Sequence, residues 1–126
     1  MSKIAQSVRD VVANIDGFDE TFRELEAEWA PDAPPIVVSM SAVGRYLAEH
    51  AERFESSNIQ RIFQRVETKL VQGTELEKDA VATGFLEAIA SVIDREPARK
   101  SVLSHAGDAA RSYLQEWNKF WGIDSE

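Results

Sequence analysis

The sequence predicts an all-α fold, a compact bundle of six to seven helices. Apolar residues recur at helical spacing along almost the whole chain, and no segment alternates apolar and polar residues long enough to form a strand. Glycine and proline fall between these periodic segments, where they end helices or open loops. The chain has 126 residues, of which 44% are hydrophobic, which is enough to bury one core. We therefore expect a single α-helical domain over residues 1–126.

The centre of the predicted fold is a helical hairpin from Ser57 to Asp94, which turns at the dipeptide Gly73-Thr74. At 100° per residue, the apolar residues of its first arm fall within an arc of about 100°, and those of the second spread over about 160°. The second arm is therefore the expected central core helix, with neighbours on two sides. The apolar positions are Ile59, Ile62, Phe63, Val66 and Leu70 in the first arm and Val81, Phe85, Leu86, Ala88, Ile89, Val92 and Ile93 in the second.

Capping residues mark the ends of both arms. Ser56 or Ser57 is expected to cap the first arm, because a hydroxyl oxygen accepts a hydrogen bond from a free backbone N–H. Gly73 suits the left-handed position that often ends a helix. Thr74 and Glu77 have the spacing of a capping box, which predicts that the second arm begins there.

Three more helices are predicted before the hairpin. The first covers residues 2–16, and the second carries an apolar stripe from Phe18 to Trp29, with Asp16 as its expected cap. A proline-rich loop then leads to the third helix, whose apolar face runs from Ile36 to Phe54. Its first residue is predicted to be Pro35, where the missing N–H has no cost, or a serine one to two turns later caps it.

The segment after the hairpin predicts a short element and a last helix. Pro97 ends the long helix or opens a short segment that reaches Ser104. Gly107-Asp108 predicts a break followed by an N-cap, and the last helix carries its apolar stripe from Ala110 to Trp121. Paired helices with short turns are similar in shape to stacked HEAT-type hairpins, although the consensus of that repeat is absent.

The charge of the chain is unevenly distributed. The formal net charge of −8 disfavours nucleic acid as a partner, because phosphate binding relies on clusters of lysine and arginine. Seven acidic residues against Arg23 alone give the segment Asp16–Asp32 a charge of −6. Three interpretations are open: a solvated helix face, a docking face for a basic protein, and a calcium or magnesium site. The candidate partner-binding residues are Asp19, Glu20, Glu24 and Glu28.

No catalytic or metal-binding pattern appears in the sequence. His50 and His105 lack the spacing of known metal sites, and no serine has histidine and aspartate partners in a known order. We therefore predict no enzymatic activity, no cofactor and no metal. The three tryptophans fit core positions better than a binding hot spot, and Gly84 indicates either close helix packing or the approach of a ligand. The tryptophans are Trp29, Trp117 and Trp121.

The expected compartment is the cytoplasm. The chain has no cysteine, which fits a reducing environment. Its first residues lack the apolar core of a signal peptide, and no apolar run approaches the roughly 20 residues that cross a bilayer. Neither a membrane nor an exported location is predicted.

Three stretches resemble a poorly characterised bacterial family, a domain of unknown function. They are Ala82-Thr83-Gly84-Phe85-Leu86-Glu87, Trp117-Asn118-Lys119-Phe120-Trp121 and Gly44-Arg45-Tyr46-Leu47. Members of that family are small all-helical proteins, some of them found in the company of polymorphic or contact-dependent toxins. The resemblance implies an immunity-like role, in which the protein binds and blocks a toxin domain. It implies no site residues.

These observations give one leading functional hypothesis and one alternative. The leading hypothesis is a non-enzymatic protein-binding module of the immunity type, whose acidic N-terminal helix complements a basic toxin domain. The alternative is a helical adaptor or scaffold that self-associates through an apolar patch.

Overall fold

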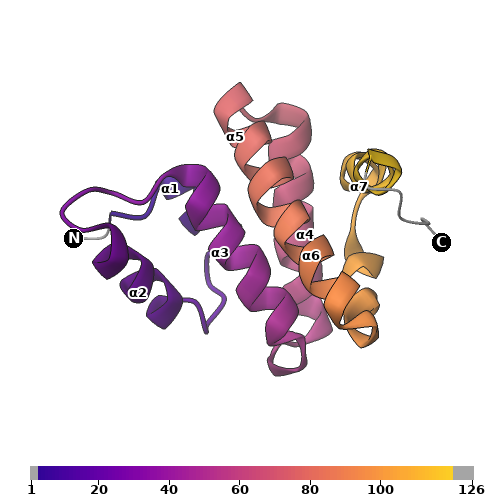
Figure 1. Ribbon diagram of the computed structural model, residues 1–126, viewed down its shortest axis with the longest axis horizontal. Coiled ribbons are helices and arrows are strands. Elements are labelled where there is room, and N and C mark those ends of the chain that lie inside the picture. The colour runs from indigo at the N-terminus through magenta and orange to yellow at the C-terminus, as the bar shows by residue number, and fades with distance from the viewer. Residues whose placement is uncertain (1–2, 121–126) are drawn as a thin grey trace.

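Helices make up most of the chain that the computed structural model describes, residues 3–120 (Figure 1). Seven α-helices, one π-helical segment (η2) and two 3-10 segments (η1 and η3) lie in this range, and no strand does, which confirms the all-α prediction. In chain order they are α1 Gln6–Val11, α2 Asp19–Trp29, α3 Ile36–Glu49, η1 Ala51–Arg53, α4 Ser56–Gln72, α5 Glu75–Asp79, η2 Ala80–Leu86, α6 Glu87–Arg95, η3 Pro97–His105 and α7 Asp108–Phe120.

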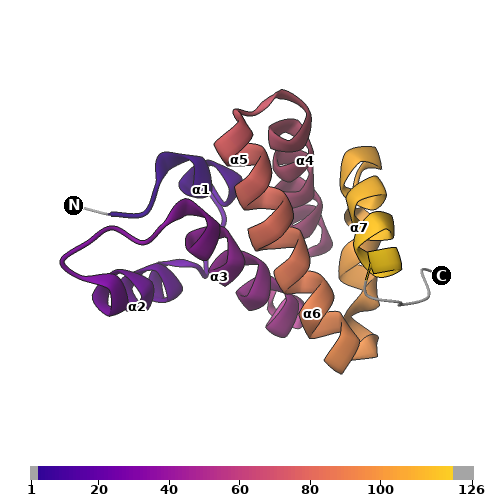
Figure 2. The ribbon, with the colours of Figure 1, turned by 45° about the horizontal axis from the view of Figure 1, so that its top comes forward.

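The predicted hairpin is present and forms the centre of the molecule. Its first arm is α4, and its second arm is one rod made of α5, η2 and α6 (Figures 1 and 2). In η2 every residue except Thr83 is buried, and α3 and α4 both contact this segment. The prediction of a central second arm is therefore confirmed. The π-helical geometry, in which the turns are wider than in an α-helix, was not predicted.

One of the three predicted caps of the hairpin is confirmed. The backbone N of Glu77 donates to Thr74 Oγ1 at 3.1 Å, and the backbone N of Thr74 donates to Glu77 Oε1 at 3.0 Å, so the capping box forms. The prediction for Ser56 and Ser57 was wrong, because Glu55 precedes the first turn of α4 and no side chain caps it. The left-handed conformation predicted for Gly73 was also wrong. This residue is extended, with φ −73° and ψ 170°, because the chain passes directly from α4 to the cap at Thr74.

Two glycines bring α3 and η2 into backbone contact. A Cβ atom on Gly44 would lie 2.5 Å from the carbonyl oxygen of Phe85, and one on Gly84 would lie 2.6 Å from that of Val37. Such distances are shorter than a van der Waals contact, so each helix approaches the other at a position without a side chain. The prediction that Gly84 permits close packing is confirmed.

The first helix is shorter than predicted. It spans only Gln6–Val11, although the apolar residues on both sides of it are buried as expected. Asn14 has a positive φ of 64°, which ends the helical path. Arg65 of α4 donates to the carbonyl oxygens of Val11 and Ala13 at 3.1 and 2.8 Å. A side chain more than fifty residues away therefore satisfies carbonyls that a longer helix would have paired itself.

The next two helices begin close to their predicted positions, but with different caps. Phe18 precedes α2 without a side-chain cap, and Asp16 is exposed, so the predicted role of Asp16 was wrong. Pro35 takes the cap position of α3 rather than its first turn. That helix ends at Glu49, and Phe54, which was predicted on its face, packs against the core from the extended chain after η1.

The C-terminal helix is anchored to the hairpin by carboxylates. Pro97 opens η3, as one of the two predicted alternatives had it, and α7 begins at Asp108. The amides of Ala109 and Ala110 donate to the carboxylate of Glu67 on α4 at 2.7 and 3.1 Å. Two of the free N–H groups at the start of this helix are thus satisfied by another helix. The predicted stop of α7 at Gly122 lies outside the described residues, as does Trp121.

Candidate functional site

The second helix, α2, lies at one end of the molecule (Figure 1), and its buried residues lie on one side. Phe22 and Leu25 face the core, where the Phe22 ring stacks on Phe18 with the ring centroids 6.3 Å apart. The Phe18 ring also contacts the rings of Tyr46 and Phe54, at 5.5 and 5.4 Å. An apolar, largely aromatic contact therefore fixes the inner face of α2 and leaves its outer face in solvent.

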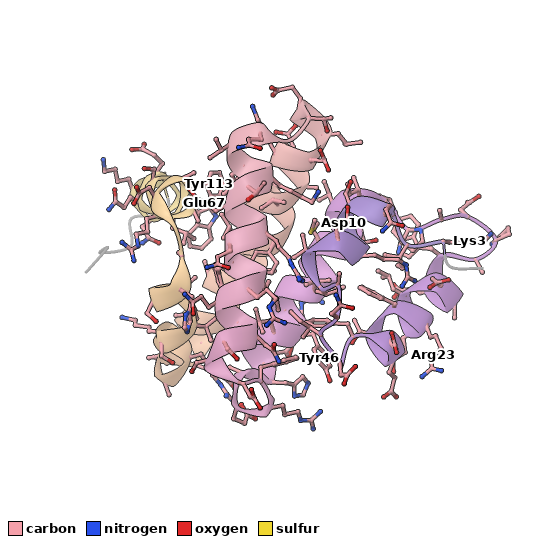
Figure 3. All side chains as sticks on the ribbon, turned by 180° about the vertical axis from the view of Figure 1, so that it is seen from behind. Lys3, Asp10, Arg23, Tyr46, Glu67 and Tyr113 are labelled. Carbon is pink, nitrogen blue, oxygen red and sulfur yellow. The ribbon has the colours of Figure 1, made fainter. Side chains whose placement is uncertain are left out.

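The four predicted partner-binding residues lie on that outer face. Asp19, Glu20, Glu24 and Glu28 are all exposed. At 100° per residue, Glu20 and Glu24 lie near the middle of the face and the other two at its borders, within roughly 180°. Within residues 3–120, none of the four makes an ion pair. We call these four residues the α2 acidic face; Arg23, also exposed, projects from the same side (Figure 3).

Glu26 differs from the acidic face because it holds the N-terminal segment in place. Its carboxylate lies 3.7 Å from the guanidinium of Arg9 and accepts a hydrogen bond from the backbone N of Lys3 at 3.1 Å. The Arg9 guanidinium also lies 5.1 Å from the centre of the Phe22 ring, in a cation–π contact. The acidic segment therefore divides into a structural carboxylate and a face that is left to solvent.

The predicted core role of Trp29 was wrong. Along the inner stripe of α2, exposure rises from 3% at Phe22 to 9% at Leu25 and 37% at Trp29. The stripe continues beyond the elements that cover its first two turns, so the last residue of the helix is left partly in solvent. A large aromatic side chain thus lies next to Glu28 in the chain. Trp117, in contrast, packs against the core as predicted.

The two histidines lie apart from each other and from α2. The ring of His50 lies 4.5 Å from that of Tyr46, at the end of α3. His105 lines a shallow cavity of about 500 Å³ between η3 and the start of α4. Over residues 3–120, no three or more histidine, aspartate or glutamate side chains gather closely enough to hold a metal ion.

A polar groove between α3 and the rod η2–α6 was not predicted. It has a volume of about 550 Å³. Its polar residues recur every four positions, from Ser41 to Glu49 on α3 and from Thr83 to Arg95 on the rod. This spacing places each set in a stripe on one face of its helix, and it is the only feature of the sequence that indicates the groove. The register of the two stripes depends on how α3 packs, so the sequence alone does not bring them together. The lining residues are Ser41, Arg45, Glu49, Thr83, Glu87, Ala88, Ser91, Val92 and Arg95. We call this site the α3–α6 groove.

One family model matches residues 8–122, almost the whole chain, and its description is Domain of unknown function (DUF7674). The chain belongs to this family. Neither the curated proteins nor the solved structures contain a match. The DUF7674 match bears out the predicted resemblance to a domain of unknown function, whereas the bacterial origin and the immunity role stay predictions. Within the described range, no helix has the length and apolar character needed to cross a membrane.

Proposed function

We propose that this DUF7674 protein is a non-enzymatic protein-binding module that docks a basic protein through the α2 acidic face. The observation that carries the proposal is a row of four exposed carboxylates that make no ion pair within the described chain. Several negative charges on one helix speed the association of a positively charged partner and disfavour the binding of an acidic one. The aromatic contacts on the inner side of α2 keep this face in a fixed orientation.

The partner class that we propose is a toxin domain, which makes the protein immunity-like. A nuclease toxin needs a basic surface to bind phosphate groups, and an acidic helix covers such a surface with complementary charge. The resemblance to proteins found beside polymorphic toxins supports the same choice. Trp29, the last residue of the inner stripe, adds a partially exposed tryptophan at the C-terminal end of α2, where it can enter a pocket of the partner.

The test is a charge reversal with a matched control. The double variant Glu20→Lys/Glu24→Lys is compared with Asp79→Lys/Asp94→Lys, which changes two exposed acidic residues of the central rod by the same total charge. The partner to use is a basic nuclease toxin domain. We expect the first variant to raise the dissociation constant at least about tenfold and to flatten its dependence on salt.

The control variant should leave both quantities nearly unchanged. Equal losses in the two variants would mean that net charge, and not the α2 acidic face, determines binding. Absence of any effect when all four residues, including Asp19 and Glu28, are reversed would exclude this face from recognition altogether.

A self-associating adaptor is the second candidate, and one observation favours it. Val71 and Leu76, on either side of the turn between α4 and α5, are 60% and 61% exposed, more than any other large hydrophobic side chain of the described residues. If these residues join two copies, the mass measured by light scattering will rise with protein concentration, and Leu76→Ser will abolish the rise. A constant monomer mass over the same concentration range would exclude this candidate.

A further inference from the structure

The α3–α6 groove lies where two helices run side by side in the same direction (Figure 1). Because Gly44 and Gly84 allow backbone contact between α3 and η2, the polar stripes next to this contact are held close together. One stripe belongs to α3, and the other continues from η2 into α6. Ala88 and Val92, which have small or short side chains, also line the groove. The groove is therefore an intrinsic feature of the way in which the helices cross.

The two arginines of the groove have no carboxylate partner within residues 3–120. Arg45 makes no ion pair there, and the Nε of Arg95 donates only to the backbone oxygen of Ser91, at 3.4 Å. Glu49 follows Arg45 by one helical turn and is also exposed and without an ion pair. Guanidinium groups form paired hydrogen bonds with carboxylates readily, so two of them in one groove favour a carboxylate ligand.

The remaining carboxylate of the groove is already engaged. Glu87 accepts a hydrogen bond from the hydroxyl of Tyr113 on α7. Burial and this carboxylate raise the pKa of Tyr113 to about 12, so the phenol remains a donor over the physiological range. The charges left for a ligand are therefore positive at Arg45, negative at Glu49 and positive at Arg95.

A ligand that matches this pattern carries two carboxylates and one ammonium group. We propose that the α3–α6 groove binds a free acidic amino acid. Its two carboxylates pair with Arg45 and Arg95, and its ammonium group pairs with Glu49. The hydroxyls of Ser41 and Ser91 line the same groove and can donate to the carboxylates.

The size and setting of the groove agree with such a ligand. A volume of about 550 Å³ is within the usual range for small-molecule sites and is large enough for a free amino acid. The adjoining π-helical segment η2 is a geometry that proteins often use at functional sites. A zwitterionic ligand also suits a chain of net charge −8 better than a phosphorylated one, because it adds less negative charge.

The experiment is an amide NMR titration of the whole protein with L-glutamate and L-aspartate. We expect saturable shifts confined to α3 and α6. Glutamine, which lacks the second carboxylate, and N-acetylglutamate, which lacks the ammonium group, should each bind at least about tenfold more weakly. A dipeptide that begins with glutamate, whose α-carboxylate is replaced by an amide, should also bind at least about tenfold more weakly. Equal binding of this dipeptide and of glutamate would contradict the pairing of the α-carboxylate with an arginine.

Variants connect the shifts to the proposed contacts. Arg45→Gln, Arg95→Gln and Glu49→Gln should each weaken binding at least about tenfold, whereas the control Arg61→Gln, an exposed arginine of α4, should not. All four positions are exposed, so circular dichroism should show an unchanged fold. If neither amino acid gives saturable shifts, or if N-acetylglutamate binds as tightly as glutamate, the proposal is wrong. The test needs no protein partner, so it can fail while docking through α2 stands.

Discussion

The two outermost helices, α2 and α7, are attached to the body of the molecule by different physical means. The inner face of α2 is fixed by a cluster of aromatic rings formed by Phe18, Phe22, Tyr46 and Phe54. Besides apolar packing, α7 is held by two carboxylates of the hairpin, Glu67 at its first turn and Glu87 at Tyr113 (Figure 3). Apolar contacts depend on area, whereas hydrogen bonds depend on the position of a few atoms. The two ends should therefore respond to different perturbations.

The largest effect is expected when the ring cluster is broken. Phe18 is 2% exposed and touches rings from three other positions, so Phe18→Ala removes a large buried side chain and leaves a cavity. We expect the free energy of unfolding to fall by about 3–5 kcal/mol, measured by chemical denaturation. The matched change Phe18→Leu should cost clearly less. A loss below about 1 kcal/mol for Phe18→Ala would contradict an apolar attachment of α2.

An intermediate effect is expected at the first turn of α7. Glu67→Ala leaves the amides of Ala109 and Ala110 without their acceptor, which should cost about 1–2 kcal/mol, as for the loss of a helix cap. Hydrogen exchange should accelerate in α7 far more than in α2. Glu116→Ala, an exposed site of α7, is the control and should leave exchange nearly unchanged. Uniform acceleration over the whole chain would mean that Glu67 does not act locally.

The smallest change in the free energy of unfolding is expected at acid pH, where protonation of Glu77 weakens its hydrogen bonds and leaves apolar packing unchanged. Hydrogen bonds from the Thr74 amide, Lys69 and Ser7 lower the pKa of Glu77 from 4.5 to about 2. A depressed folded-state pKa gives stability that is complete above about pH 4.5 and is lost as the pH falls towards 2. Unfolding measured by denaturant across this window should show a smaller pH dependence for Glu77→Gln than for the unchanged protein. Identical slopes would show that Glu77 is not coupled to folding.

The sequence predicts what depends on local periodicity and misses what depends on tertiary register. The stripes of α2, α3, α4 and the rod predicted those helices, and the Thr74–Glu77 spacing predicted a cap made within one turn. The early end of α1 depends on Arg65, and the acceptor for the first amides of α7 is Glu67; both residues lie on a different helix. No local pattern contains such contacts.

The same distinction applies to the sites. The α2 acidic face belongs to one helix, so the sequence contains all of it, and each of its four residues is exposed as predicted. Trp29 shows where that reasoning fails, because the stripe indicates which side faces the core but not how far the core extends. The α3–α6 groove joins residues between positions 41 and 49 of α3 with residues between positions 83 and 95 of the rod. The groove exists because α3 and η2 approach closely. The sequence predicts close packing at Gly84 but does not identify Gly44 as the glycine on the facing helix.

The effects of substitutions at Gly44 and Gly84 should depend on each other, because both glycines lie at the contact between α3 and η2. A methyl group on either one would press on a carbonyl oxygen of the facing helix, 2.5 or 2.6 Å away, and would force the two backbones apart. Once they are apart, the second position has space for a side chain as well. The two glycines therefore act as a single constraint, and losing the second should cost less than losing the first. The same separation of α3 and η2 would widen the α3–α6 groove. Substitutions at these two positions would therefore change the shape of a groove that neither glycine lines.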